Sequence, residues 1–287
     1  MAESLLKGEK TMSDEQPGRI PAIERAVEQL RSLNLLSDLF VSVVLEDKEA
    51  CQYVLRKLTG IGDLMVTNVK AQYRLQNLTS KDSILDIFAE DSEKKLYNIE
   101  IQRKDTIDHA RRTRYYGSMI DKSSLDKGAG YDELADVYII YISETDLWKA
   151  GYTMYPVEKT FKNTDIPYDD GFHVIYVNAA VDDGSEVAKM MQYFKSADPY
   201  DMSQGDLSKR VHFIKREKGG YDIMCEVAEK IYEQGIEQGI EQGLEQGEEQ
   251  SKREVARNLH AMGMKDIDIA RAVNVSLNKV HEWLEFV

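Results

Sequence analysis

An acidic side chain lies within an apolar stretch typical of a β-strand, where a charge is costly to bury. The stretch KLYNIEIQ, residues 95–102, carries this acid as Glu100, and strand alternation places Glu100 and Gln102 on one face. The preceding stretch, SILDIFAED, carries Asp86 among apolar neighbours. A tight polar turn at residues 92–95 joins the two stretches, so we expect them to be adjacent strands on which Asp86 and Glu100 can converge.

Two carboxylates that meet in a partly buried place repel each other and are poorly solvated. A hard divalent cation relieves both problems. Such a cation can polarise a phosphoryl oxygen and lower the pKa of a bound water. The alternative is that each acid is a salt-bridge partner or an edge residue, and spacing alone leaves both interpretations open.

A basic segment follows the second acid. Residues 103–116 hold five basic and two acidic residues, a net charge of +3 in a chain whose net charge is −14. Three of these cations, Arg111, Arg112 and Arg114, could face phosphates, and Tyr116 could stack on a base or hydrogen-bond to the nucleic-acid backbone. The alternative is a solvated helix face or a last helical turn, where cations are favoured.

The elements that must position these residues are helices followed by a meander of strands. The order predicts an α/β fold with a central sheet flanked by helices, or an α+β sheet with helices packed on it. We expect helices at residues 22–33, 47–60 and 103–118, and strands at residues 63–76, 83–91, 95–102, 135–143 and 172–179. Within the second helix, Asp47 can cap the start and Gly60 can end it.

The chain becomes helical after residue 183, with amphipathic segments at 184–194 and 206–216 and a further helix beginning near Tyr221. The repeat EQGIEQGIEQGLEQGEEQ then occupies residues 233–250 and carries six Glu but no Lys or Arg. Residues four apart are neighbours on a helix, so the glycines form one stripe and Ile or Leu an adjoining one. A dimer seam and a flexible acidic linker are both compatible with this pattern.

The last segment, residues 251–287, has the layout of a helix-turn-helix, with Asn274 at a position that tolerates the left-handed turn conformation. If this module reads DNA, Ser276, Asn278 and Lys279 begin its recognition helix. Six basic and five acidic residues give the segment a net charge of only +1. This balance slightly favours the alternative, a helical cap or oligomerisation tip.

Composition bounds the class of protein. The 287 residues are 42% hydrophobic, enough for one sizeable domain and a smaller appendage. No stretch approaches the roughly 20 apolar residues that cross a bilayer, and the polar residues 1–18 predict a disordered N-terminus. Two cysteines, Cys51 and Cys225, fit neither a disulfide framework nor a thiolate metal cluster. We therefore expect a cytoplasmic protein that does not enter membranes.

Several ordered motifs resemble one nuclease superfamily. ILDIFAEDSEKKLYNIEIQ, followed by ARRTRYYGSMI and DVYIIYIS, is similar to the PD-(D/E)XK nucleases, in particular the branch of PD-(D/E)XK nuclease family transposases, or recombination-promoting nucleases. The similarity extends from about Leu35 to Asn178. It implies a restriction-endonuclease-like mixed central sheet with an all-helical C-terminal extension, and Mg²⁺-dependent cleavage of DNA phosphodiester bonds.

The resemblance also assigns roles. Asp86 and Glu100 would bind one or two Mg²⁺ ions, and Asp38, or instead Glu46 or Glu49, could complete the metal shell. Gln102 stands where the superfamily usually has lysine. A neutral amide can hydrogen-bond to the attacking water but cannot neutralise developing charge.

On the following helix, Arg112 and Tyr116 match a motif that supports DNA binding, with Arg111 and Arg114 beside it.

The function expected from this resemblance is a Mg²⁺-dependent DNA endonuclease linked to recombination or mobile-element DNA, dimeric through its C-terminal helices. The alternative is a catalytically weak DNA-binding or self-associating scaffold that retains the fold. The expected organisation is a nuclease-like core at 19–182, a helical extension at 183–232, the repeat at 233–250 and the tail at 251–287.

Overall fold

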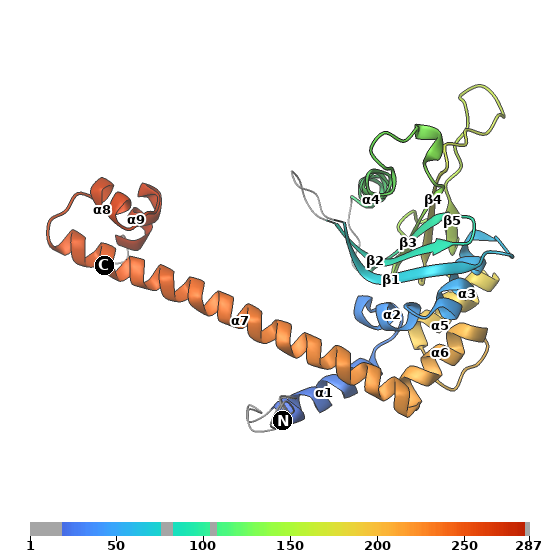
Figure 1. Ribbon diagram of the computed structural model, residues 1–287, viewed down its shortest axis with the longest axis horizontal. Coiled ribbons are helices and arrows are strands. Elements are labelled where there is room, and N and C mark those ends of the chain that lie inside the picture. Colours follow the sequence, from blue (N-terminus) through green and yellow to red (C-terminus); the bar gives the residue numbers. More distant parts are fainter. Residues whose placement is uncertain (1–18, 76–82, 104–107, 285–287) are drawn as a thin grey trace, which may run out of the picture. The chain divides into compact units, whose positions relative to one another are not determined.

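The structure is a computed structural model that describes residues 19–75, 83–103 and 108–284 (Figure 1). The N-terminal segment 1–18, expected to be disordered, lies outside the described residues. The chain divides into two compact units: residues 24–225 form the first, and the helical residues from 226 onward, grouped with the chain before residue 24, form the second.

The first unit is built on a six-stranded mixed sheet in the order β1-β2-β3-β4-β6-β5. β1, β2 and β3 are antiparallel, β3, β4 and β6 are parallel, and β5 is antiparallel to β6. The strands are β1 (Val66–Leu75), β2 (Ser83–Asp91), β3 (Leu96–Gln102), β4 (Val137–Ser143), β5 (Met154–Pro156) and β6 (Phe172–Asn178). The predicted strands are confirmed. β5 was not predicted, because three residues are too few to show an alternation of apolar and polar side chains.

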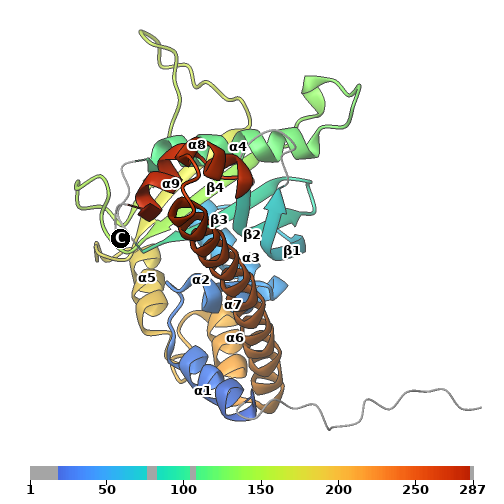
Figure 2. The ribbon, with the colours of Figure 1, turned by 90° about the vertical axis from the view of Figure 1, so that its left-hand side faces the viewer.

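Helices cover both faces of the sheet (Figures 1 and 2). α4 lies against one face, α2 and α3 lie against the other, and α5 and α6 pack on α3. The helices before the long α7 are α1 (Arg19–Ser32), α2 (Asp38–Leu45), α3 (Lys48–Thr59), α4 (His109–Ser124), the 3-10 helix η1 (Tyr131–Glu133), α5 (Glu186–Ser196) and α6 (Gly205–Arg216). The sheet flanked by helices confirms the expected restriction-endonuclease-like α/β class.

The predicted ends of α3 are confirmed. The Asp47 side chain accepts a hydrogen bond from the backbone nitrogen of Ala50 at 3.0 Å, and Gly60 ends the helix at φ +75°. Only glycine adopts this left-handed conformation without steric cost.

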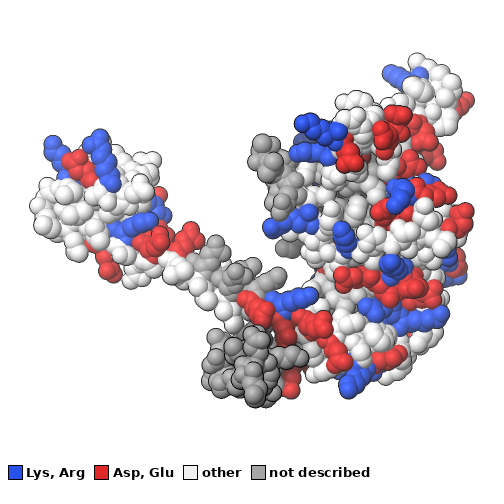
Figure 3. Space-filling model, viewed as in Figure 1, with Lys and Arg blue, Asp and Glu red and all other residues white. Residues whose placement is uncertain are grey.

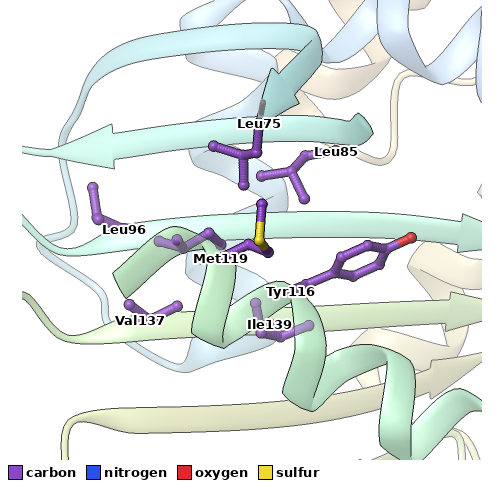
Figure 4. Packing of buried hydrophobic residues seen from close by; sticks show 8 residues of the cluster. Leu75, Leu85, Leu96, Tyr116, Met119, Val137 and Ile139 are labelled. Atoms are coloured by element: carbon purple, nitrogen blue, oxygen red, sulfur yellow. The ribbon is translucent and has the colours of Figure 1, made fainter. Parts of the chain in front are cut away.

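Helix α4 differs from the prediction of residues 103–118, because it begins at His109 and continues to Ser124. Its buried face extends beyond residue 118 through Met119 and Ile120, which pack with Tyr116 on apolar side chains of the sheet (Figure 4). Apolar contacts three and four residues apart continue a helix as long as they remain buried. This packing fixes the rotation of α4 about its axis and so decides which of its arginines faces the carboxylates.

The second unit contains most of α7 (Lys218–Ala261), followed by α8 (Asp266–Ala272) and α9 (Leu277–Leu284). The glycine repeat is helical throughout, which disagrees with the flexible-linker interpretation. Asn274 adopts φ +53°, as its position in the turn predicted. The cluster that holds the tail together comprises Ala256, Ile269, Ala270, Val273, Val280 and Trp283.

None of the helices in the described ranges is long and apolar enough to cross a bilayer.

Candidate active site

The two predicted acids meet where β2 separates from β3. The paired register of these strands ends at Ile87 and Ile99. Beyond this point the backbone N–H of Ile101 donates to an Asp86 carboxylate oxygen at 2.9 Å. This side-chain oxygen takes the role that a backbone carbonyl of β2 would have in a continued strand pair. The Asp86 backbone N–H in turn donates to the Glu100 carboxylate at 3.4 Å. The sheet itself therefore holds the two carboxylates side by side.

Burial makes this pair electrostatically unfavourable when both groups are ionised. Glu100 is only 4% exposed, whereas Asp86 is partly exposed. Desolvation, followed by repulsion from Asp86, raises the pKa of Glu100 above its ordinary value. Desolvation also raises the pKa of Asp86, and the nearby charge of Asp38 adds to this shift. A cation between the carboxylates would remove this cost.

Asn98 supports Glu100 from the same face of β3. Its Nδ2 donates to the Glu100 Oε1 atom at 2.9 Å, and the residue is fully buried. Among the described residues, the Asn98 Oδ1 atom has no hydrogen-bond partner. A buried amide oxygen without a partner is unusual, and it adds a third hard oxygen donor beside the pair.

Arg112 connects α4 to the strand that carries Glu100. Its Nη1 donates to the Gln102 Oε1 atom at 2.9 Å and its Nε donates to the Tyr116 hydroxyl at 2.8 Å. Its positive charge lowers the pKa of both carboxyl groups and opposes the effect of burial. Because the oxygen of Gln102 is bound to Arg112, the amide nitrogen is the part of Gln102 that can donate to a water or a substrate.

The oxygen donors of the site suit a divalent cation that keeps several of its waters. Within the described ranges, no three His, Cys, Asp or Glu side chains are grouped closely enough to hold a metal. Mg²⁺, however, is commonly held by one or two carboxylates and completed by waters and phosphate oxygens. The carboxylate pair Asp86 and Glu100, with the unpartnered oxygen of Asn98, fits such an ion. Asp38 does not complete a three-carboxylate group, and its role as a ligand stays a prediction.

Comparison with known proteins gives one match, to the family described as PD-(D/E)XK nuclease family transposase, over residues 53–186. The match covers a little under half of the chain. The resemblance stated from the sequence is therefore confirmed, and a nuclease-related function with it. No curated protein and no solved structure matches the chain.

The family segment contains the whole sheet, so the carboxylate pair and α4 lie within it. Along α4 the predicted DNA-binding residues separate into two groups. Arg111 and Arg114 are exposed, whereas Arg112 is half-buried and bonded inside the site. Tyr116 is 6% exposed and belongs to the apolar cluster under α4, so its predicted contact with DNA stays a prediction.

The candidate DNA-binding residues of the tail make local contacts. The Ser276 hydroxyl accepts the backbone N–H of Lys279 at 3.3 Å, and Lys279 Nζ pairs with the Glu249 carboxylate at 2.8 Å. Asn278 is exposed. The charge of Lys279 is thus already balanced within the second unit, and DNA binding by this module remains a prediction.

Several side chains of the site were not singled out from the sequence. Strand alternation already placed Asn98 on the face of Glu100, so that signal was present. Tyr141 and Tyr176 could not be found in this way. They become neighbours of Glu100 only through the parallel register of β3, β4 and β6, which pairs Glu100 with Tyr141 and Tyr141 with Tyr176.

Replacing Arg112 with methionine is expected to lower the free energy of unfolding by about 1–3 kcal/mol. The change leaves the Gln102 oxygen and the Tyr116 hydroxyl without their donor, and removes a cation that lowers the pKa of both carboxyl groups. Urea denaturation measures this loss. The exposed neighbour Arg111, changed to methionine, is the matched control and should change stability by no more than about 0.5 kcal/mol. Equal stability of the two variants would contradict the bridging role of Arg112.

Proposed function

We propose that the protein is a Mg²⁺-dependent DNA endonuclease that hydrolyses phosphodiester bonds, acting in recombination or on mobile-element DNA. The family supports a nuclease-related function. The observation that carries the finer proposal is the adjacency of Asp86 and Glu100, two carboxylates with raised pKa values in a site of hard oxygen donors.

In the proposed mechanism Asp86 and Glu100 would hold the cation, and Asn98 fixes one oxygen of Glu100. When bound, Mg²⁺ supplies charge neutralisation for the scissile phosphate and acidifies a water. The Gln102 amide nitrogen donates to the attacking water, oriented by the bond between its oxygen and Arg112. The water loses a proton to solvent as it attacks phosphorus in line with the leaving oxygen, and a second water protonates that oxygen as the P–O bond breaks.

The exposed arginines of α4 have a second task in this proposal. Arg111 and Arg114 would neutralise phosphates on either side of the scissile bond, which positions the strand without reading its sequence. Because they lie on the same helix as Arg112, the packing of α4 sets their distance from the carboxylates.

Incubation of purified protein with supercoiled plasmid tests the function. We expect nicked plasmid with Mg²⁺ and intact plasmid with EDTA. Folded protein that leaves plasmid and single-stranded DNA intact with Mg²⁺, Mn²⁺ and Ca²⁺ would overturn the proposal.

A second candidate is a catalytically weak DNA-binding or self-associating protein. The near-complete burial of Glu100 and the engagement of Gln102 by Arg112 favour it. The two candidates differ in whether Mg²⁺ produces cleavage or only binding.

Self-association through α7 is part of both candidates. At the repeat glycines, including Gly239 and Gly243, an added Cβ would meet no atom within 4 Å, so the stripe is open along the helix. The neighbouring Ile240 and Leu244 are 58% and 67% exposed. A second copy of the helix could approach closely along this stripe and cover both apolar side chains.

Replacing Gly239 and Gly243 with alanine tests this seam. Each change should stabilise the helix by about 1 kcal/mol, since alanine is the better helix former. It should nevertheless weaken association, because the methyl groups hold the two helices apart. Sedimentation velocity measures the change, with Glu245→Ala as control on another face of α7. Unchanged association in the double variant would exclude the glycine stripe as the contact.

A further inference from the structure

An aromatic cluster lies on the strands next to Glu100, at the same level of the sheet. Glu100 on β3 is paired with Tyr141 on β4, which is paired with Tyr176 on β6. The ring of Tyr176 lies 5.8 Å from that of His109, the first residue of α4, and 5.3 Å from that of Trp148. The rings of His109 and Trp148 are 5.0 Å apart.

The cluster lies on the same side of the sheet as the carboxylate pair. The Tyr176 hydroxyl is 3.1 Å from the Thr113 hydroxyl of α4, the helix that also bonds to Gln102 through Arg112. Neighbouring strands are about 4.8 Å apart, so the backbone of Tyr176 lies roughly 10 Å from that of Glu100. A nucleotide strand with one phosphate at the carboxylates can reach the cluster with an adjacent nucleotide.

The loop that carries Trp148 is held in place by hydrogen bonds. The Asp146 carboxylate accepts the Tyr155 hydroxyl at 2.7 Å and the backbone N–H groups of Lys149 and Gly151 at 3.0 Å each. The Tyr155 hydroxyl also accepts the backbone N–H of Ala150 at 3.2 Å. A tryptophan on so well bonded a loop loses little conformational entropy when a ligand binds.

Trp148 itself remains 46% exposed. Its ring is nearly perpendicular to those of both aromatic neighbours, at 89° to His109 and 76° to Tyr176. Neither neighbour is stacked parallel on the indole, and the exposed part of Trp148 is available to a flat ligand. A large aromatic side chain in this state, beside a phosphate-binding site, is suited to base stacking.

The net charge of the protein favours a contact with DNA that does not depend on electrostatics. The net charge of −14 opposes a strong electrostatic grip on duplex DNA. On the face seen in Figure 3, the described Lys and Arg side chains are interspersed with Asp and Glu and form no continuous basic surface. Stacking on an aromatic ring contributes affinity that does not depend on net charge, but it requires a base that is free of its partner.

We propose that Trp148, on its bonded loop beside His109 and Tyr176, stacks on an unpaired nucleobase of the strand held at Asp86 and Glu100, so that the substrate is single-stranded or locally unpaired DNA. This inference rests on the proposed function, because the base reaches Trp148 only if the DNA strand is bound at Asp86 and Glu100. Binding measured with Ca²⁺, with the length of the oligonucleotide checked after the titration, tests it separately from cleavage.

The test uses Trp148 as its own reporter. The chain has two tryptophans, and the other, Trp283, is 4% exposed in the tail cluster. In full-length Trp283→Phe protein with Ca²⁺, titration with a thymidine oligonucleotide should quench Trp148 fluorescence. A blunt hairpin duplex of equal length should quench it far less. Equal quenching by both would overturn the preference for unpaired bases, as would quenching by neither.

A second measurement follows the fluorescence anisotropy of a labelled oligonucleotide with unaltered Trp283. Trp148→Ala should weaken single-strand binding by about tenfold to a hundredfold, and Trp148→Phe should restore most of the affinity. Tyr131→Ala, at an 86% exposed tyrosine, is the matched control and should bind normally. Wild-type affinity in Trp148→Ala would overturn the stacking site. Plasmid nicking by that variant would show that the nuclease proposal survives without it.

Discussion

Glu100→Gln protein is expected to be more stable than the wild type when no metal is present. Glu100 is 4% exposed and adjoins Asp86, and burial and repulsion raise its pKa. Glutamine keeps an oxygen that can accept from Asn98 and from the Asp86 backbone, but carries no charge. The gain at pH 7.5 should be on the order of 1–3 kcal/mol, a rise in Tm of about 2–4 °C per kcal/mol.

The gain should depend on pH in one direction. A carboxyl group whose pKa is raised by folding costs no stability below its unfolded pKa, where both states are protonated. The cost then grows as the pH rises through the window between the unfolded and the folded pKa. Thermal unfolding in EDTA should thus show near-equal stability close to pH 4 and a growing advantage of the variant towards pH 8. Glu158→Gln, at an exposed position outside the site, is the matched control and should show no such trend. A Glu100→Gln variant less stable than the wild type at pH 8 would contradict the claim that the two buried carboxylates destabilise the folded protein.

Asp86→Asn protein is expected to lose Mg²⁺-dependent nicking by at least about a thousandfold, because one of the two proposed ligands is removed. Asparagine retains an oxygen that can accept the backbone N–H of Ile101, so the separation of β2 from β3 should be preserved. Supercoiled-plasmid relaxation measures the loss under conditions where the wild type is active.

The loss of activity in Asp38→Asn protein, compared with that in Asp86→Asn protein, shows whether Asp38 is a metal ligand. Its charge reaches Asp86, but it does not complete a three-carboxylate group. We therefore expect a smaller loss, about tenfold to a hundredfold, as is usual for outer residues of a metal site. Wild-type activity in Asp86→Asn protein would remove Asp86 from the mechanism, whereas an Asp38 effect as large as that of Asp86 would make Asp38 a ligand.

The stability and activity effects point in opposite directions for the same reason. Two carboxylates held together by the sheet destabilise the folded chain, and the same arrangement gives a cation a place to bind. Such opposition is expected at functional sites, where local stability is given up for chemistry. A merely structural acid pair would lose stability when one member is changed.

Much of the sheet followed from the sequence because strand alternation and turns are local signals. The antiparallel pair β2 and β3 was predictable from the short turn at residues 92–95, and with it the meeting of Asp86 and Glu100. The ends of α4 were not predictable, since burial of Met119 and Ile120 against distant strands decides where that helix stops. Local propensity cannot report such contacts.

The remainder of the site depends on long-range register. Tyr141 and Tyr176 reach the row of Glu100 only after a parallel crossover. The bond from Arg112 to Gln102 likewise depends on how α4 is rotated against the sheet. The sequence identified both residues but not their contact, and therefore not that Arg112, rather than Arg111 or Arg114, is turned towards the carboxylates.

The central claim is that Asp86 and Glu100 together bind a divalent cation, and Mn²⁺ binding measured by electron paramagnetic resonance tests it most directly. Titration of wild-type protein, with and without a single-stranded oligonucleotide, should show one or two bound Mn²⁺ ions that Mg²⁺ displaces. The folded Glu100→Gln protein should lose this binding, while Glu158→Gln, at an exposed position outside the site, retains it. Identical Mn²⁺ binding by wild type and Glu100→Gln, or none by the wild type even with the oligonucleotide, would contradict the account.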